Sequence, residues 1–241
     1  MEYRDEPGII EPAGKNLGIK TAVATFSKHL FDELVLRSGA KRVYMLPGAV
    51  ECPVYAFDCG GKSIAAYMSP IGAPAAACAL EQAAACGVEN FVVFGICGAL
   101  TDIPTRKLVV PTHALRDEGT SRNYTPSGEF IELKNHKTVY GKLSSYGLEC
   151  ECGGCWTTDG FYRETRSAAS EAVHKGCIAV DMECAALQAV CDYRGKNFYT
   201  FFITADSLAG EKWEPNYILD PSATDAETAA VAAAIRLAKE L

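Results

Sequence analysis

The segment 179–190, Ala-Val-Asp-Met-Glu-Cys-Ala-Ala-Leu-Gln-Ala-Val, constrains the fold of this chain more than any other. The apolar residues up to 180 are typical of a buried strand, and after Glu183 apolar residues recur at helical spacing at positions 184, 187, 190 and 191. Asp181 and Glu183 therefore fall at a buried strand-to-helix junction, where an unsatisfied charge costs on the order of several kcal/mol. Acids also favour the positive end of a helix, but that explanation suits one acid better than two. The segment predicts a ligand site at the end of a strand.

Strand-like and helical patterns alternate along most of the 241 residues, which predicts an α/β domain with an at least partly parallel central sheet. Gly60-Gly61 predicts a hairpin turn, and the apolar run 91–94 predicts a strand buried on both faces. We expect one domain over residues 19–241, preceded by a polar arm over residues 1–18. The expected strands are 21–26, 42–46, 53–59, 63–68, 90–95, 108–111, 153–158, 178–180 and 198–204, and the expected helices are 28–38, 73–86, 163–175, 183–195 and 225–241.

Charge and composition exclude several classes of partner. The net charge is −7 and the pI is about 5.2, with no stripe of Lys and Arg, so we expect no nucleic-acid partner. The chain has no apolar leader and no run of about 18 apolar residues, so we expect a soluble protein with no membrane partner. The 11 cysteines are scattered and odd in number, which favours reduced thiols and a cytoplasmic location.

Three cysteines, Cys150, Cys152 and Cys155, stand close enough together to suggest part of a zinc site. A structural zinc site needs a fourth ligand, and the alternation around these cysteines also suits a strand. We favour the strand and expect neither a metal nor a cofactor.

Four segments that follow predicted strands carry unusual residues. Glycines three apart in Gly95-Ile96-Cys97-Gly98-Ala99-Leu100 predict a loop whose N–H groups can face an anion or a sugar, although such a pair alone more often marks a tight turn. The second segment, Thr157 to Thr165, holds two aromatic residues and an arginine. The third is Asp181-Met182-Glu183, and the fourth is Thr204-Ala205-Asp206-Ser207-Leu208.

Taken in this order, these segments resemble the nucleoside phosphorylase superfamily, which includes purine nucleoside and uridine phosphorylases and their nucleosidase relatives. The resemblance is most specific over residues 180–187, extends through residues 116–121 and 157–165, and covers roughly residues 60–240. It implies a single α/β domain whose mixed, partly barrel-like central sheet is flanked by helices.

The resemblance also implies roles for individual residues. Glu183 would accept hydrogen bonds from ribose hydroxyls, with Met182 packed against the sugar. Asp206 would give a proton or a hydrogen bond to the departing base, which requires a protonated carboxyl that burial can provide. The alternative for Asp206 is a loop contact with Ser207. The other expected substrate-binding residues are Cys97 and Gly98 beneath the sugar and base, Phe161 stacked on the base, and Tyr162 and Arg163 at the base edges.

The chain departs from the family where phosphate binds. The family's phosphorylases use a Gly-Asp-Pro loop after the first strand and arginines on two other segments, whereas this chain has Ser27-Lys28-His29 after that strand. Val93 stands in place of one arginine, and Ile96 replaces a hydroxyl residue that contacts phosphate. Lys28, His29 and Arg116 are the candidate substitutes, with Arg122 as a further one, and Ile96 keeps a place beside the phosphate.

The expected activity is cleavage of the N-glycosidic bond of a nucleoside, by phosphorolysis to the free base and ribose 1-phosphate. Two alternatives stay open: hydrolysis by activated water, which would account for the missing arginines, and a non-catalytic nucleoside-binding protein. Asp206 favours a purine, whereas the segment 157–165 resembles the uridine enzymes equally well. The resemblance also implies a homodimer or a higher homo-oligomer.

Overall fold

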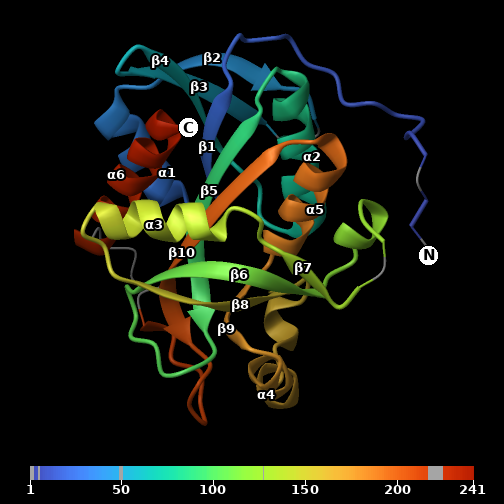
Figure 1. Cartoon of the computed structure of the whole chain (residues 1–241), viewed down its shortest axis with the longest axis vertical. Coiled ribbons are helices and arrows are strands. Elements are labelled where there is room, and N and C mark those ends of the chain that lie inside the picture. The colour runs from blue at the N-terminus through green and yellow to red at the C-terminus, as the bar shows by residue number, and fades with distance from the viewer. Residues whose placement is uncertain (1–2, 5, 49–50, 127, 217–224) are drawn as a thin grey trace.

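The computed structural model describes residues 3–4, 6–48, 51–126, 128–216 and 225–241 (Figure 1). Its strands are β1 (Thr21–Thr25), β2 (Lys41–Leu46), β3 (Cys52–Cys59), β4 (Lys62–Met68), β5 (Asn90–Ala99), β6 (Leu108–Asp117), β7 (Phe130–Glu132), β8 (Cys150–Thr158), β9 (Cys177–Asp181) and β10 (Asn197–Ser207). Its helices are α1 (Lys28–Ser38), α2 (Ala73–Ala85), α3 (His136–Ser145), α4 (Arg166–His174), α5 (Cys184–Arg194) and α6 (Asp225–Glu240), with short 3-10 helices η1 (Ser121–Asn123) and η2 (Phe161–Arg163).

The central sheet closes on itself at one end. Its strand order is β10-β6-β8-β9-β5-β1-β4-β3-β2, and β10 pairs with β5 as well as with β6. Five strands therefore form a ring, from which β1, β4, β3 and β2 continue as an open sheet. Parallel pairs (β1 with β4 and β5, β5 with β10, β8 with β6 and β9) coexist with antiparallel ones. The expected mixed and partly barrel-like sheet is confirmed.

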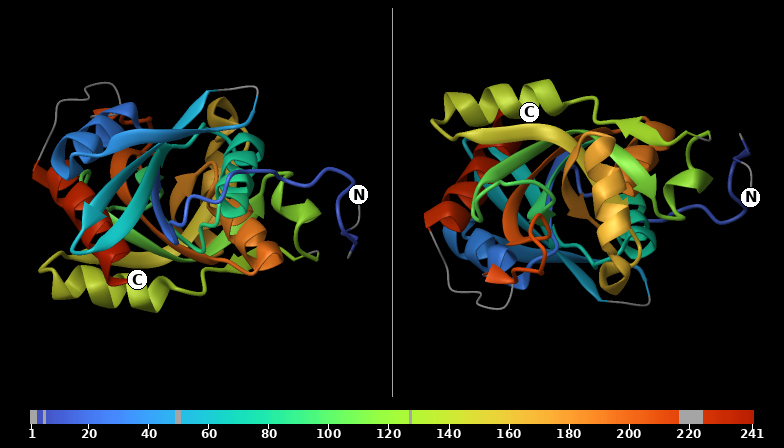
Figure 2. Two further views of the ribbon diagram at one scale, coloured as in Figure 1. Left: turned by 90° about the horizontal axis from the view of Figure 1, so that it is seen from above. Right: turned by 90° about the horizontal axis from the view of Figure 1, so that it is seen from below.

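Helices cover both faces of the sheet (Figures 1 and 2). Helices α1, α3 and α6 pack on one face through a core that includes Leu30, Leu143 and Val231. Helices α2 and α5 pack on the other face through a second core that includes Leu80 and Leu187. The smaller helix α4 lies against β9. The α5 side chains from 184 to 191 are all buried, so the helical part of the segment 179–190 is a central helix of the domain.

The strand β5 confirms one expectation and corrects another. Phe91, Val92, Val93 and Phe94 are each at most 2% exposed, as expected for a strand with sheet neighbours and helices on both faces. The strand continues to Ala99, however, so the expected loop at 95–100 was wrong. Neither Gly95 nor Gly98 has a positive φ angle. A Cβ atom on Gly98 would lie 2.8 Å from Leu208 Cδ1 and 2.9 Å from Val180 Cγ1, so close packing, and not a turn, requires glycine there.

Other boundaries differ for local reasons. Thr165 caps α4 by accepting a hydrogen bond from the Ala168 N–H, so this helix begins at residue 166 and not at 163. Strand β10 runs to Ser207, which places Asp206 inside the strand and not in a following loop. Strands β6 and β8 are longer than expected, and α3 and β7 were not predicted. The predicted hairpin at Gly60-Gly61 is confirmed by the β3–β4 pairing and two positive φ angles.

The arm has no helix or strand in its described residues and runs along the outside of α2, with its far end projecting from the domain (Figure 2). Its Leu17 N–H donates to the Cys86 carbonyl at 2.9 Å, and Glu11 pairs with Arg194 at 3.0 Å.

Cysteines 150, 152 and 155 lie on β8, as the strand interpretation predicted, and all 11 cysteines have free thiols. In the described ranges, no cluster of three or more His, Cys, Asp or Glu side chains is arranged to hold a metal ion. No helix in the same ranges has the length and apolar character to cross a membrane.

Candidate active site

A cavity of about 490 Å³ opens where β1, β5 and β10 end, which is the usual place for a ligand in an α/β sheet. These three strands are parallel, so their carboxyl ends meet at one edge. Strand β9, one of the five strands of the ring, pairs with β5 at Gly98 and brings its own end to the same place. The lining residues are Phe26, Ser27, Ile71, Ile96, Cys97, Gly98, Phe161, Glu164, Val180, Asp181, Met182, Glu183 and Asp206.

Asp181 holds the start of α5 in place. Its Oδ2 accepts hydrogen bonds from the N–H groups of Glu183 (3.0 Å) and Cys184 (2.6 Å). Its Oδ1 accepts from the Thr157 hydroxyl at 2.7 Å and from the Cys155 thiol at 3.4 Å. Burial raises the pKa of Asp181, and these four hydrogen bonds oppose that rise. The helix-cap explanation is therefore the right one for Asp181.

Glu183 lines the same cavity and is only 6% exposed. Its Oε1 accepts a hydrogen bond, at 2.6 Å, from the N–H of Gly72, and the Met182 backbone also stabilises the charged form. Gly72 precedes α2 with a φ of 95°, a conformation that favours glycine, and it points its N–H at the carboxyl. Burial first, and then the charge of Asp181, raise the pKa of Glu183 to about 8. A carboxyl that is buried with so little internal compensation is suited to a polar ligand.

Asp206 reaches the cavity from β10, where the pairing with β5 shifts register between Thr204 and Asp206. Such a bulge redirects the side chains that follow it. Asp206 is 3% exposed, and its Oδ2 accepts a hydrogen bond from the Trp213 indole N–H at 2.7 Å. Burial raises the pKa of Asp206 and the Trp213 hydrogen bond opposes this rise. The alternative explanation of Asp206, a contact with Ser207, does not occur among the hydrogen bonds of this carboxyl in the described residues.

Several other predicted residues also line the cavity: Cys97, Gly98, Met182, Phe161 and Ile96. Burial raises the pKa of the Cys97 thiol well above its usual value, so this thiol stays neutral. A Cβ atom on Gly98 would lie 3.3 Å from Asp206 Oδ1, which ties the small residue on β5 to the position of that acid.

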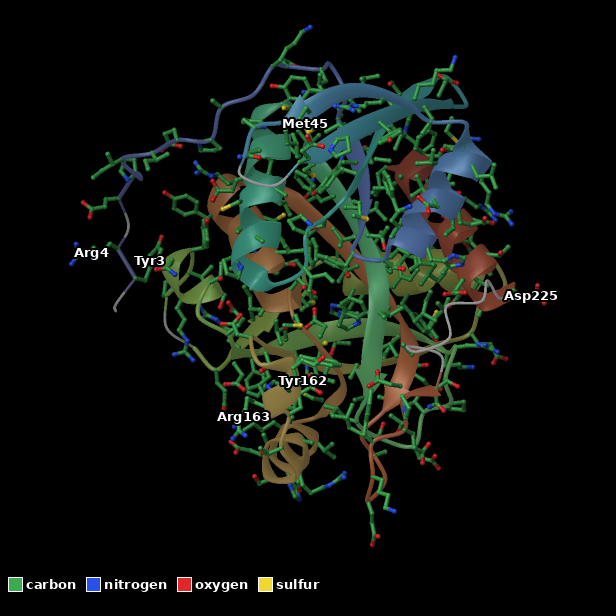
Figure 3. All side chains as sticks on the ribbon, turned by 180° about the vertical axis from the view of Figure 1, so that it is seen from behind. Tyr3, Arg4, Met45, Tyr162, Arg163 and Asp225 are labelled. Atoms are coloured by element: carbon green, nitrogen blue, oxygen red, sulfur yellow. The ribbon has the colours of Figure 1, made fainter. Side chains whose placement is uncertain are left out.

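Tyr162 and Arg163 do not line this cavity. Both residues are labelled in Figure 3. Tyr162 is 94% exposed and lies on a neighbouring surface cavity of about 220 Å³, and the side chain of Arg163 is exposed. The short 3-10 helix η2 explains the difference, because its turn directs Phe161 inward and the next two residues outward.

The three candidate phosphate cations also lie elsewhere. Lys28 pairs with Asp32 on the exposed side of α1, and His29 Nε2 lies 3.9 Å from Glu227 Oε2 on α6. The guanidinium of Arg116 is buried and donates to the Ser121 hydroxyl and to the carbonyls of Thr125, Pro126 and Gly128, so it stabilises the segment that follows η1. Arg122 lines the same separate cavity as Arg116. Among the described residues, no Lys, Arg or His lines the cavity that contains Glu183.

Glu164 is an acidic cavity residue to which the sequence analysis assigned no role, as it did for the apolar lining residues Phe26, Ile71 and Val180. Glu164 follows η2 directly and lines both the main cavity and the neighbouring one that holds Tyr162 and Trp213. Burial and the charge of Asp206 raise the pKa of Glu164 to about 7. The available signal was an acid directly after the aromatic pair of the segment 157–165.

The cavity thus joins a buried glutamate, a strand-end aspartate, an aromatic ring and a thioether at the end of a partly closed α/β sheet. Residues 20–241 match the family model of the phosphorylase superfamily, and the chain belongs to that superfamily.

Curated relatives include a guanosine phosphorylase from Halorubrum lacusprofundi, 30% identical over 139 residues (56% of this chain and 57% of that protein). They also include a DeoD-type purine nucleoside phosphorylase from Caldanaerobacter subterraneus subsp. tengcongensis, 29% identical over 156 residues (61% and 66%). The matched region thus spans less than two thirds of the length of either relative.

Solved structures share the fold. A purine nucleoside phosphorylase from Toxoplasma gondii in complex with immucillin-H aligns with a TM-score of 0.78 at 18% identity, over 98% of this chain and 99% of that one. A uridine phosphorylase from Vibrio fischeri ES114 also reaches 0.78, at 22% identity over 94% of both chains.

Proposed function

We propose that this protein cleaves the N-glycosidic bond of a nucleoside by phosphorolysis, releasing the base and forming ribose 1-phosphate. The observation that carries the proposal is the presence of Glu183 and Asp206, both nearly completely buried, in one cavity with Phe161. Membership of the phosphorylase superfamily supports the same reaction class.

The proposed chemistry assigns one group of residues to the sugar and another to the base. The protein alone holds Glu183 with a pKa of about 8, and ribose hydroxyls that donate to its carboxyl favour the charged form and lower that pKa. Once ionised, Glu183 accepts charge-assisted hydrogen bonds from the ribose hydroxyls, which are about twice as strong as neutral ones. As the bond to the base breaks, the sugar develops positive charge, which the carboxylates of an anionic cavity stabilise. Phe161 offers a ring face for the base, and the acids beside it offer a proton to the base as it departs.

Hydrolysis is the second candidate, and a specific observation favours it. Four carboxyl side chains line the cavity, and no described Lys, Arg or His joins them, although a phosphate dianion needs cations or N–H donors. A water molecule, being neutral, needs none.

Base release from a nucleoside panel, measured with and without inorganic phosphate, separates the candidates. The panel contains adenosine, inosine, guanosine, uridine and cytidine. Release that requires phosphate and yields ribose 1-phosphate supports phosphorolysis, whereas release of free ribose without phosphate supports hydrolysis. Failure to release any base, together with measurable nucleoside binding by calorimetry, would indicate the non-catalytic alternative.

We further propose a homo-oligomer in the cytoplasm. The apolar side chain of Ile71 lines the cavity and is 66% exposed, so a second copy of the chain would shield it from water. Analytical ultracentrifugation at micromolar concentration tests this proposal, and a monomer at all concentrations would contradict it.

A further inference from the structure

Two acids near Phe161 differ in what holds them. Asp206 has a fixed hydrogen-bond donor, the Trp213 indole N–H at 2.7 Å. Glu164 is partly buried, and its carboxyl makes no hydrogen bond or ion pair with any residue in the described ranges. Both side chains line the same cavity, and their charges repel each other strongly enough to affect the protonation of Glu164.

Two carboxylates in one partly buried cavity do not ionise independently, because the second charge must form beside the first. Between the two ionisations the pair therefore holds a single proton. A hydrogen bond donated to a carboxylate stabilises its charged form, so the Trp213 N–H keeps the negative charge on Asp206. The proton then resides on Glu164.

We propose that Glu164 is the general acid that protonates the departing base, and that Asp206 is its ionised partner. The inference rests on the proposed function. In this step the bond from C1′ to the base nitrogen breaks and its electron pair passes to the base. The Glu164 O–H gives its proton to the base, and a phosphate oxygen forms the new bond to C1′. Glu164 takes a proton from solvent after the products leave.

Of the described residues that line the two cavities with Glu164, one is a cation, Arg166 on α4. Its guanidinium is held by the backbone carbonyls of Leu208, Gly210 and Glu211, to which it donates. The burial of Glu164 and the Asp206 charge both favour the protonated form, and place its pKa near 7, where an acid is effective at neutral pH. The titratable or charged groups that share the two cavities with Glu164 are Asp206, Asp181, Glu183, Cys97, Tyr162 and Arg166.

The test compares Glu164→Gln with Asp206→Asn on a substrate that needs a proton and on one that does not. Inosine needs a proton on its leaving base, whereas 7-methylinosine carries a cationic base that departs neutral; uridine and 5-fluorouridine replace them if only pyrimidines react. Glu211→Gln is the matched control, because Glu211 is an exposed acid of the adjoining loop that lines neither cavity.

We expect Glu164→Gln to slow inosine about 100-fold or more, the usual scale for a general acid, and to slow 7-methylinosine only a few-fold. It should also abolish the fall in kcat as pH rises through about 7. Asp206→Asn should keep that fall but move it to lower pH, because removing the Asp206 charge makes Glu164 a stronger acid.

Two results would overturn the assignment while leaving the proposed function standing. One is a Glu164→Gln variant with wild-type rates and pH profile; the other is a leaving-group bias that appears in Asp206→Asn alone. A wild-type protein that releases no base from any nucleoside overturns the proposed function itself, and the general-acid role with it.

Carboxyl ¹³C NMR gives a readout independent of turnover, since the resonance lost in Glu164→Gln should titrate near pH 7. Titration of that resonance below pH 5 would overturn the inference, and unchanged thermal melting of both variants confirms that they fold.

Discussion

The buried carboxyl of Glu183 should make the protein less stable as the pH rises, and Glu183→Gln should remove that dependence. Glu183 has an ordinary pKa of 4.5, and in the folded protein its pKa is about 8. Between these values the folded state keeps a proton that the unfolded chain releases. Stability is therefore complete below about pH 4.5 and falls until the folded protein also ionises, near pH 8.

The magnitude follows from the two pKa values. Each pH unit across which only the folded state holds the proton removes about 1.4 kcal/mol, so the span from 4.5 to about 8 corresponds to at most about 5 kcal/mol. Water in the open cavity relaxes around the new charge, and we expect about 2–4 kcal/mol. Glutamine keeps an Oε1 acceptor for the Gly72 N–H but cannot ionise, so the variant should be as stable as wild type at pH 5 and more stable at pH 9.

The assay is urea denaturation of wild type and Glu183→Gln at five pH values between 5 and 9. The informative quantity is the difference in unfolding free energy at each pH, because the raised pKa values of Asp206 and Glu164 affect both proteins alike. The difference therefore reports the ionisation of Glu183 together with its repulsion of Asp181. Glu211→Gln, which removes an exposed acid, should show no such trend. A Glu183→Gln difference that stays constant within about 0.5 kcal/mol across the range would refute the reasoning.

Three further substitutions test the site. Glu183→Ala should reduce kcat/KM for base release roughly 100-fold or more with an unchanged circular dichroism spectrum, because the ribose loses its charged acceptor; near-wild-type turnover would remove this residue from the site. Asp181→Ala should destabilise the fold by about 2–4 kcal/mol in urea, since the N–H groups at the start of α5 lose their acceptor; a loss below about 0.5 kcal/mol would contradict the capping role. Gly98→Ala should lower kcat/KM about tenfold by displacing Asp206, whereas Gly141→Ala, whose Cβ meets no atom within 4 Å, should leave activity unchanged.

The elements that the sequence predicts well are those whose signal is local. The apolar run at 91–94 and the hairpin glycines at 60–61 each determine their structure through adjacent residues alone, and both predictions are confirmed. Helix α3 escaped prediction because only Val139 and Leu143 of its ten residues are buried, which leaves a weak apolar stripe.

The errors arise at residues whose structural role depends on contacts with residues far away in the sequence. Gly98 suggests a turn when seen alone, but it is required by Leu208 and Val180, which approach it from other strands and loops. Arg116 suggests a free cation, but it binds a loop that ends 12 residues later. The sequence analysis assigns no role to Glu164, because only the fold brings it to the cavity beside Asp206.

The hydrogen bonds within the protein separate the structural acid of this cavity from those suited to a ligand. Asp181 accepts four hydrogen bonds from its own chain and needs nothing further. Glu183 accepts from the N–H groups of Gly72 and Met182, and Asp206 accepts from the Trp213 indole and from its own backbone. The carboxyl of Glu164 accepts none in the described part of the chain. A buried carboxyl without enough internal donors raises the free energy of the empty protein, and a ligand that brings hydroxyl or N–H groups relieves that cost. The cavity is therefore built to be filled by a molecule rich in donors, as the sugar and base of a nucleoside are.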